Sequence, residues 1–258
     1  MGSDLGNGFA AYPMVEEGEA TGVVAAVYAQ LLDRMPFVPS LFKSLALSPG
    51  YLVLAHEQAA AVLPDETFRS LAQQLSSSVG DAVTPPADQP VREALARFTE
   101  PLSRMLLLTA GLLLALDDEL DRPPAPGRAP EPRVVEPRQP APSQWDAPAP
   151  QLYGEIRAAL ETPMVNSIWR ALAGQGLLET AWSALRPQVG GSRPAADEVQ
   201  RRAFEAARQV PWQVAATPAA LDRAGLADVR PGVASVLDAY AKTLPRVLVL
   251  VSSSTGGG

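Results

Sequence analysis

Residues 153–187, with the sequence YGEIRAALETPMVNSIWRALAGQGLLETAWSALRP, decide the fold because a similar stretch occurs earlier in the chain. The earlier stretch is residues 27–55, VYAQLLDRMPFVPSLFKSLALSPGYLVLA. In both, a tyrosine opens an amphipathic helical pattern, and a Pro-x-Val-x-Ser motif and then Leu-Ala follow. The motif positions Pro36, Val38 and Ser40 match Pro163, Val165 and Ser167 at a constant offset of 127 residues.

A second matched block lies further along each half, at a constant offset of 142 residues. It pairs Val91, Leu95, Phe98, Leu102, Arg104, Leu106 and Leu108 with Val233, Leu237, Tyr240, Leu244, Arg246, Leu248 and Leu250. Two ungapped blocks in the same order indicate an internal duplication, and a duplication determines the architecture before any other feature. We therefore predict two similar helical repeats that form a pseudo-dimer, with a pocket at the interface between the repeats.

The apolar periodicity predicts an all-α fold. Expected helices cover residues 23–33, 41–63 with a break at 48–50, 65–75, a long apolar stretch from residue 90, and then 152–160, 166–173, 177–185, 197–210 and 231–251. Asp65 has the position and side chain of a helix N-cap. The run VLVLV at 247–251 also fits a strand, but its match to the apolar helix of the first half favours a helix.

The chain divides into five segments. These are an N-terminal lead-in (1–22), a first helical repeat (23–121), a Pro-rich linker (122–150), a second helical repeat (151–251) and a flexible tail (252–258). The linker holds ten of the 26 prolines, a composition typical of an extended or disordered connection. The lead-in is acidic and Gly-rich, and we expect no special role for it.

Composition restricts the classes of function. The net charge of −7 leaves no basic surface for nucleic acid. The chain has no cysteine and one histidine, which excludes thiolate and multi-histidine metal sites. The longest apolar run, residues 105–116, is too short to span a bilayer, so we expect no transmembrane segment. The N-terminus lacks a signal-peptide pattern, and a cytoplasmic location is the expectation.

The second-half pattern resembles the group I 2-haloacid dehalogenases. It consists of Tyr153, Ile156 and Arg157, the segment PMVNSIWRALA, and then Leu178, Ala181, Trp182 and Leu185. The resemblance implies an all-helical tandem repeat with an active site at the interface between the repeats. In that family an Asp after a Ser activates the water that displaces halide. The matching position here is Ile168, which cannot accept a proton, so the catalytic residue stays unassigned and haloacid hydrolysis is not expected.

Carrying the family's pocket onto this sequence predicts a lining that is more apolar than a haloacid site. An aromatic pair and an Asn and Tyr of the family fall on apolar or small residues here, and one tyrosine is kept. Such a wall suits a small, largely apolar ligand. The predicted lining is Phe37, Ser40, Leu102, Met105, Ser167, Ile168, Tyr240, Thr243, Leu244 and Val247.

An acidic motif offers an alternative function. Asp117, Asp118 and Asp121 lie in DDELD, an instance of the DDxxD motif of class I terpene and prenyl-diphosphate synthases. In those enzymes the carboxylates hold Mg²⁺ against a diphosphate, so Mg²⁺ is the candidate cofactor and no other is indicated. The competing interpretation is an acidic helix end exposed to solvent. Because four acidic residues at a helix C-terminus oppose the helix dipole, we expect compensating charges nearby.

Other reactive or aromatic side chains have structural interpretations. Ser167 as a nucleophile needs a base, and His56 is the only imidazole; packing is the expected role of His56. Trp169 and Trp182 occupy core-like positions. Arg104 and Arg246, matched between the halves, are candidates for ion pairs or anion binding at the interface. Asn166 is the expected N-cap of the helix that follows it.

Three functions are therefore open. The first is a divergent dehalogenase-like protein that binds or transforms a small apolar ligand. The second is a Mg²⁺-dependent terpene or prenyl-diphosphate enzyme. The third is a non-catalytic binding or structural protein. The partner expected in the first two is a small molecule, and the sequence does not define the oligomeric state.

Overall fold

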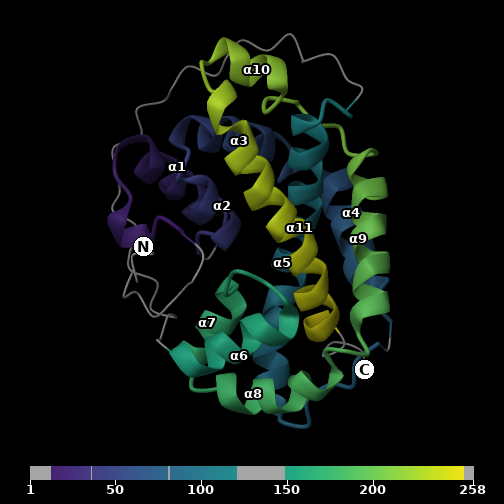
Figure 1. The fold of residues 1–258 in the computed structure, drawn as a ribbon. Helices are drawn as coiled ribbons and strands as arrows, with labels where there is room; N and C mark the ends of the chain where they lie inside the picture. The colour runs from purple at the N-terminus through teal and green to yellow at the C-terminus, as the bar shows by residue number, and fades with distance from the viewer. Residues whose placement is uncertain (1–12, 36, 81, 121–148, 253–258) are drawn as a thin grey trace.

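The computed structural model describes residues 13–35, 37–80, 82–120 and 149–252. These residues form eleven α-helices and three short 3-10 helices, and the described ranges contain no strand (Figure 1). The all-α prediction is confirmed. Pro36, Asp121, most of the predicted linker and residues 253–258 lie outside the described part of the chain.

The first half supplies five α-helices. They are α1 (Gly22–Leu32), α2 (Ser40–Leu45), α3 (Pro49–Val62), α4 (Glu66–Ser77) and α5 (Gln89–Leu116), and a 3-10 turn, η1 (Glu17–Glu19), precedes them. Asp65 caps α4 by accepting the Phe68 N–H at 3.0 Å, as predicted, and Asp88 caps α5 in the same way through the Val91 N–H at 2.9 Å. The break between α2 and α3 follows the Ser-Pro-Gly sequence at 48–50.

The second half supplies six α-helices. They are α6 (Pro150–Leu160), α7 (Ser167–Gly174), α8 (Leu178–Leu185), α9 (Arg193–Ala207), α10 (Pro218–Arg223) and α11 (Arg230–Ser252), with 3-10 turns η2 (Arg186–Gln188) and η3 (Ala227–Val229). The VLVLV run lies inside α11, so the helical interpretation is correct. The short α10 is absent from the sequence-based prediction because six residues carry too little periodicity.

The two long helices form the centre of the molecule. α5 and α11 pack along each other, α5 also contacts α4, α7 and α9, and α11 contacts α2, α4 and α9. Figure 1 shows α11 crossing in front of α5, with α6, α7 and α8 gathered at one end of the pair and α1, α2 and α3 beside the other. The C-terminal parts of both helices are apolar on nearly all sides, and this is why each is surrounded by other helices.

α5 is long and apolar enough to cross a bilayer by length and composition, the only such helix in the described ranges. Most of its apolar stretch, 72%, is buried inside the protein. A core helix passes the same test, so the length of α5 is weak grounds for a membrane span. The fold is compatible with a soluble protein.

Candidate functional site

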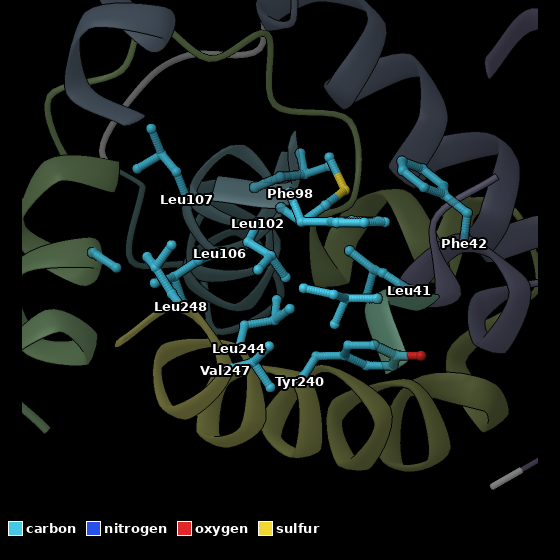
Figure 2. Close-up of a cluster of buried hydrophobic side chains, with 14 of the residues drawn as sticks. Leu41, Phe42, Phe98, Leu102, Leu106, Leu107, Tyr240, Leu244, Val247 and Leu248 are labelled. Carbon is cyan, nitrogen blue, oxygen red and sulfur yellow. The ribbon is translucent and has the colours of Figure 1, made fainter. Parts of the chain in front are cut away.

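A cavity of about 210 Å³ lies where the N-terminal half of α5 meets α2, α7 and α11. It receives side chains from both halves of the chain, and most of them are apolar. Phe37 and Phe98 stack on one another in its wall with ring centroids 5.9 Å apart. Figure 2 shows Leu102 of α5, Leu41 of α2 and Leu244 of α11 converging on one region. The lining residues are Arg34, Met35, Phe37, Pro39, Ser40, Leu41, Phe98, Glu100, Pro101, Leu102, Arg104, Met105, Asn166, Ser167, Ile168, Tyr240 and Leu244.

Eight of the ten residues predicted to line a pocket lie on this wall. They are Phe37, Ser40, Leu102, Met105, Ser167, Ile168, Tyr240 and Leu244. Thr243 does not, because it faces a different side of α11 and its hydroxyl is 2.7 Å from that of Thr162. Val247 shares the face of Tyr240, but seven residues advance a helix by about 10 Å, so it lies in the core beyond the cavity (Figure 2).

Ile168, at the position where the resemblance places a catalytic aspartate, lies on the cavity wall and is 1% exposed. The one carboxylate on the wall is Glu100, whose side chain is 73% exposed and pairs with Arg104 at 3.3 Å. Asn166 precedes α7, but its side chain does not cap the helix, contrary to the prediction, and its Oδ1 is buried with no hydrogen-bond partner among the described residues. The cavity therefore has no buried carboxylate to serve as general base.

Hydroxyl groups join the two halves beside the cavity. Ser40 Oγ and Ser167 Oγ, the matched serines of the two Pro-x-Val-x-Ser motifs, are 2.6 Å apart. Ser44 Oγ and the Tyr240 hydroxyl are 3.0 Å apart. Ser167 is thus engaged with another hydroxyl, and among the described residues no hydrogen bond joins it to His56. A serine without a base is a weak nucleophile.

His56 lies on α3 and is not on the cavity wall. Burial lowers its pKa to about 4, and the positive charge of Arg34 lowers it further in the same direction. The imidazole is therefore neutral near pH 7. The predicted packing role agrees with its burial.

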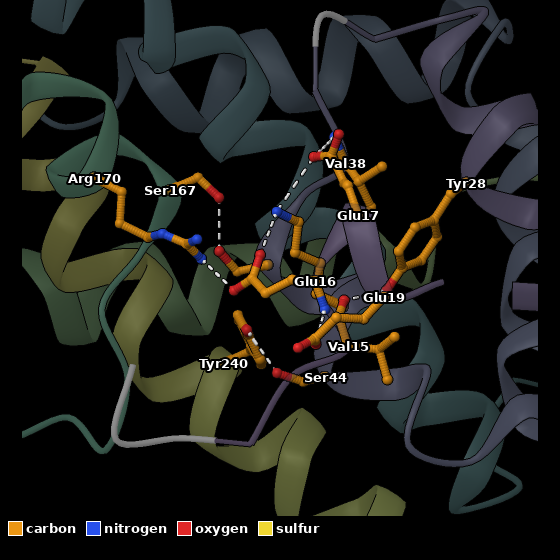
Figure 3. A network of polar contacts seen from close by, with 12 residues as sticks. Val15, Glu16, Glu17, Glu19, Tyr28, Val38, Ser44, Ser167, Arg170 and Tyr240 are labelled. Carbon is orange, nitrogen blue, oxygen red and sulfur yellow. Dashed lines mark hydrogen bonds and ion pairs between the residues drawn. The ribbon is translucent and has the colours of Figure 1, made fainter. Parts of the chain in front are cut away.

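A buried ion network lies next to the serine pair (Figure 3). Glu16 accepts from Lys43 Nζ through Oε2 and from Arg170 Nη1 through Oε1, each at 3.0 Å. Lys43 is 3% exposed and Arg170 is 2% exposed, and Glu17 Oε1 is 3.2 Å from Lys43 Nζ. Burial raises the pKa of Glu16, but the hydrogen bond of Arg170 and the charge of Lys43 outweigh it, so the pKa lies below its usual value.

This network corrects the view of residues 13–20 as an ordinary lead-in. The Tyr28 hydroxyl donates to the Val15 carbonyl at 2.8 Å, and the Val15 N–H donates to the Lys43 carbonyl at 3.0 Å. Glu17 Oε1 accepts the Val38 N–H at 3.3 Å. Lys43 and Arg170 obey the same offset of 127 as the matched serines. That offset was the signal from which the cation pair could have been found.

The acidic motif DDELD does not reach the cavity. Asp117 and Asp118 are exposed at the end of α5, and Asp118 adopts a left-handed conformation with φ of 58°. The N–H groups of Asp118 and Glu119 bond back to the carbonyls of Ala115 and Leu114 at 3.2 and 2.7 Å, the Schellman pattern of a helix C-terminus. Asp121 lies outside the described residues.

The expected compensation for this acidic end is present. Arg230 donates to the Leu116 carbonyl at 2.9 Å, and Arg208 pairs with Glu119 at 2.7 Å. In the described part of the chain no three His, Asp or Glu side chains group as a metal site would require. The predicted metal positions Asp117 and Asp118 are thus accounted for as a helix end.

The matched arginines and tryptophans have structural contacts. Arg104 donates to the Leu63 carbonyl at 2.9 Å, and Arg246 donates to the Leu160 carbonyl and lies 3.5 Å from Glu161. Each arginine thereby satisfies a carbonyl at a helix C-terminus. Trp169 and Trp182 are buried and pack edge to face at 5.7 Å, as the packing interpretation predicted.

Taken together, the helix order and the cavity define an all-α protein of the haloacid dehalogenase type. Comparison with solved structures finds the same fold in D-2-haloacid dehalogenase. A complex of that enzyme with L-LA superimposes with a TM-score of 0.73 at 18% identity, covering 93% of this chain and 94% of the other. A mutant complexed with D-2-CPA gives 0.74 at 18% identity with the same coverage, and a further mutant gives 0.72 over 93% of each chain. No protein-family model matches the sequence, and no curated protein matches it either.

Proposed function

We propose that this protein binds a small, largely apolar molecule in the cavity between its two halves. The observation that carries the proposal is the cavity wall, where Ile168 and a ring of apolar side chains stand in place of a water-activating carboxylate. A concave site of apolar side chains with a few hydroxyl groups is typical of ligand pockets. We further propose that the two halves are repeats and that the cavity lies at their interface.

The size of the cavity restricts the ligand. An engineered cavity of about 150 Å³ holds benzene, so a cavity of about 210 Å³ suits a benzene ring with one or two small substituents. Farnesyl and geranylgeranyl chains are several times larger than benzene. Their size and the position of Asp117 and Asp118 away from the cavity leave the terpene-cyclase alternative without support from the described residues.

A binding assay tests the proposal. We expect benzyl alcohol or toluene to raise the melting temperature of the protein and to bind in isothermal titration calorimetry. Leu102→Phe fills the cavity and should abolish binding. Leu47→Phe makes the same change at a leucine that is 50% exposed and should leave binding intact. Equal binding to both variants, or none to the unmodified protein, contradicts the proposal.

Halide release tests the chemistry. Because no carboxylate replaces the aspartate in the cavity, we expect no halide from 2-chloropropionate above background. Halide release that disappears in Glu100→Gln would show that the exposed carboxylate on the wall acts as the base, and the binding-protein interpretation would then be wrong.

A further inference from the structure

Two buried cations from matched positions hold a single carboxylate. Lys43 on α2 and Arg170 on α7 are 127 residues apart, as the paired serines are. Each contacts a different oxygen of Glu16 at 3.0 Å. One charged donor for each oxygen is the arrangement of a carboxylate-binding site, and such charge-assisted hydrogen bonds are the strong ones in proteins.

The cation pair lies directly behind the cavity wall. Lys43 follows Ser40 by three residues on α2, and Arg170 follows Ser167 by three residues on α7. Residues three apart share a helix face and are about 5 Å apart along the axis. Since the serine pair lines the cavity, the cations lie about one helical turn beyond it. Figure 3 shows the hydroxyl pair beside the Glu16 carboxylate and Arg170.

The carboxylate of Glu16 can leave this position without unfolding the segment that carries it. The segment is held by the Tyr28–Val15 and Glu17–Val38 hydrogen bonds, and neither uses the Glu16 side chain. That side chain is 26% exposed, whereas those of Lys43 and Arg170 are 4% and 3% exposed. A change of rotamer therefore moves the carboxylate towards solvent while both cations stay buried.

We propose that Lys43 and Arg170 form a carboxylate-binding site which Glu16 occupies in this structure and which the carboxylate of a ligand takes over. This inference rests on the proposed function, because the apolar body of the ligand would fill the cavity. The ligand class is a small aromatic or aliphatic carboxylate. Its charge replaces that of Glu16, so the charge on the site is unchanged by the exchange.

The first test asks whether the site accepts a free carboxylate. In Glu16→Ala the side chain is removed and space opens between the cations. We expect acetate to raise the melting temperature of this variant by about 4 °C or more over chloride at equal ionic strength. Glu16→Gln fills the same space and Glu19→Ala removes a nearby exposed carboxylate, so neither should distinguish acetate from chloride.

If Glu16→Ala does not fold in chloride, the yield of refolded protein makes the same comparison. Folding in acetate alone supports the site. An equal response to acetate and chloride, or an acetate effect as large in Glu16→Gln, overturns it.

The second test asks whether the ligand uses the site. Benzoate and benzyl alcohol have similar apolar bodies and differ in charge. We expect benzoate to bind Glu16→Ala about tenfold or more tighter than the unmodified protein, because no internal carboxylate competes. Benzyl alcohol should bind both equally. Equal benzoate affinities overturn the inference while benzyl alcohol binding keeps the proposed function, and failure of benzyl alcohol to bind either protein contradicts the proposed function itself.

Discussion

A single side chain decides which chemistry this cavity can perform. Ile168 is 1% exposed and surrounded by apolar side chains and hydroxyl groups. A carboxylate at this position would be desolvated, which raises its pKa and makes it a stronger base when ionised. With isoleucine the same environment is an apolar wall.

Ile168→Asp measures how costly a carboxylate is here. We expect a loss of about 3 kcal/mol of unfolding free energy at pH 7.5, because a charge is buried without a partner. The loss should shrink at pH 5, where the raised pKa leaves the carboxyl neutral. Urea unfolding at both pH values checks this, with Ile168→Asn as the uncharged variant of the same shape. A pH-independent difference between the two variants would contradict the expected pKa.

His56 makes stability depend on pH. Its pKa is about 4 in the native state against about 6.5 when unfolded, so the unfolded chain takes up a proton first as pH falls. Stability is full above pH 6.5 and declines between pH 6.5 and 4, by about 2 kcal/mol at pH 5. We expect His56→Gln to remove this component in urea unfolding at pH 7.5 and 5. Identical pH dependence in the two proteins would show that His56 is not the group responsible.

At the scale of elements, α5 combines three requirements. Its N-terminal half lines the cavity, its middle packs against α9 and Trp212, and its end forms the acidic cap. Gly111 provides the close approach to Trp212, whose indole donates to the Ala207 carbonyl at 2.7 Å and packs edge to face on Phe68. A methyl group at position 111 would overlap the Trp212 ring, with Cη2 only 2.6 Å away.

Gly111→Ala should therefore destabilise the protein by about 2 kcal/mol, since overpacking outweighs the gain in helix propensity. Gly154→Ala is the matched change in α6, where nothing lies within 4 Å of the added carbon. It should stabilise the protein by about 0.5–1 kcal/mol. Thermal and urea unfolding of both variants check the pair. Stabilisation by both changes would show that Trp212 moves aside freely.

At the scale of the molecule, the two halves meet through paired polar groups as well as through α5 and α11. Ser40 and Ser167 are partners across this contact at 2.6 Å, and each would leave the other without its hydroxyl partner if removed. Thr162 and Thr243 form a second such pair at 2.7 Å. These pairs require the halves to keep one relative position.

A double-mutant cycle on the serines tests that coupling. Ser40→Ala and Ser167→Ala should each cost about 1–2 kcal/mol, and the double variant should cost no more than one of them. The control cycle combines Ser40→Ala with Ser77→Ala, an exposed serine on α4, and should be additive. Additivity in the first cycle would mean that the hydroxyl pair does not couple the halves.

The sequence by itself determined the helices and much of the cavity wall. Helical periodicity, the Asp65 cap and the match between the two apolar stretches were enough to predict α4, α5 and α11, because these signals are local or repeated in the chain. The same alignment placed eight wall residues correctly. Its two misplaced residues, Thr243 and Val247, depended on the rotation and reach of α11, which neighbouring helices decide.

Only the tertiary structure decided the roles of the charged residues. DDELD reads equally well as a metal motif or as a helix end until the Schellman bonds and Arg230 are seen. Glu16 lies in a stretch with no periodicity, and its partners are 27 and 154 residues away. Burial of an ion pair depends on which distant segments exclude water from it, and sequence distance carries no information about that exclusion.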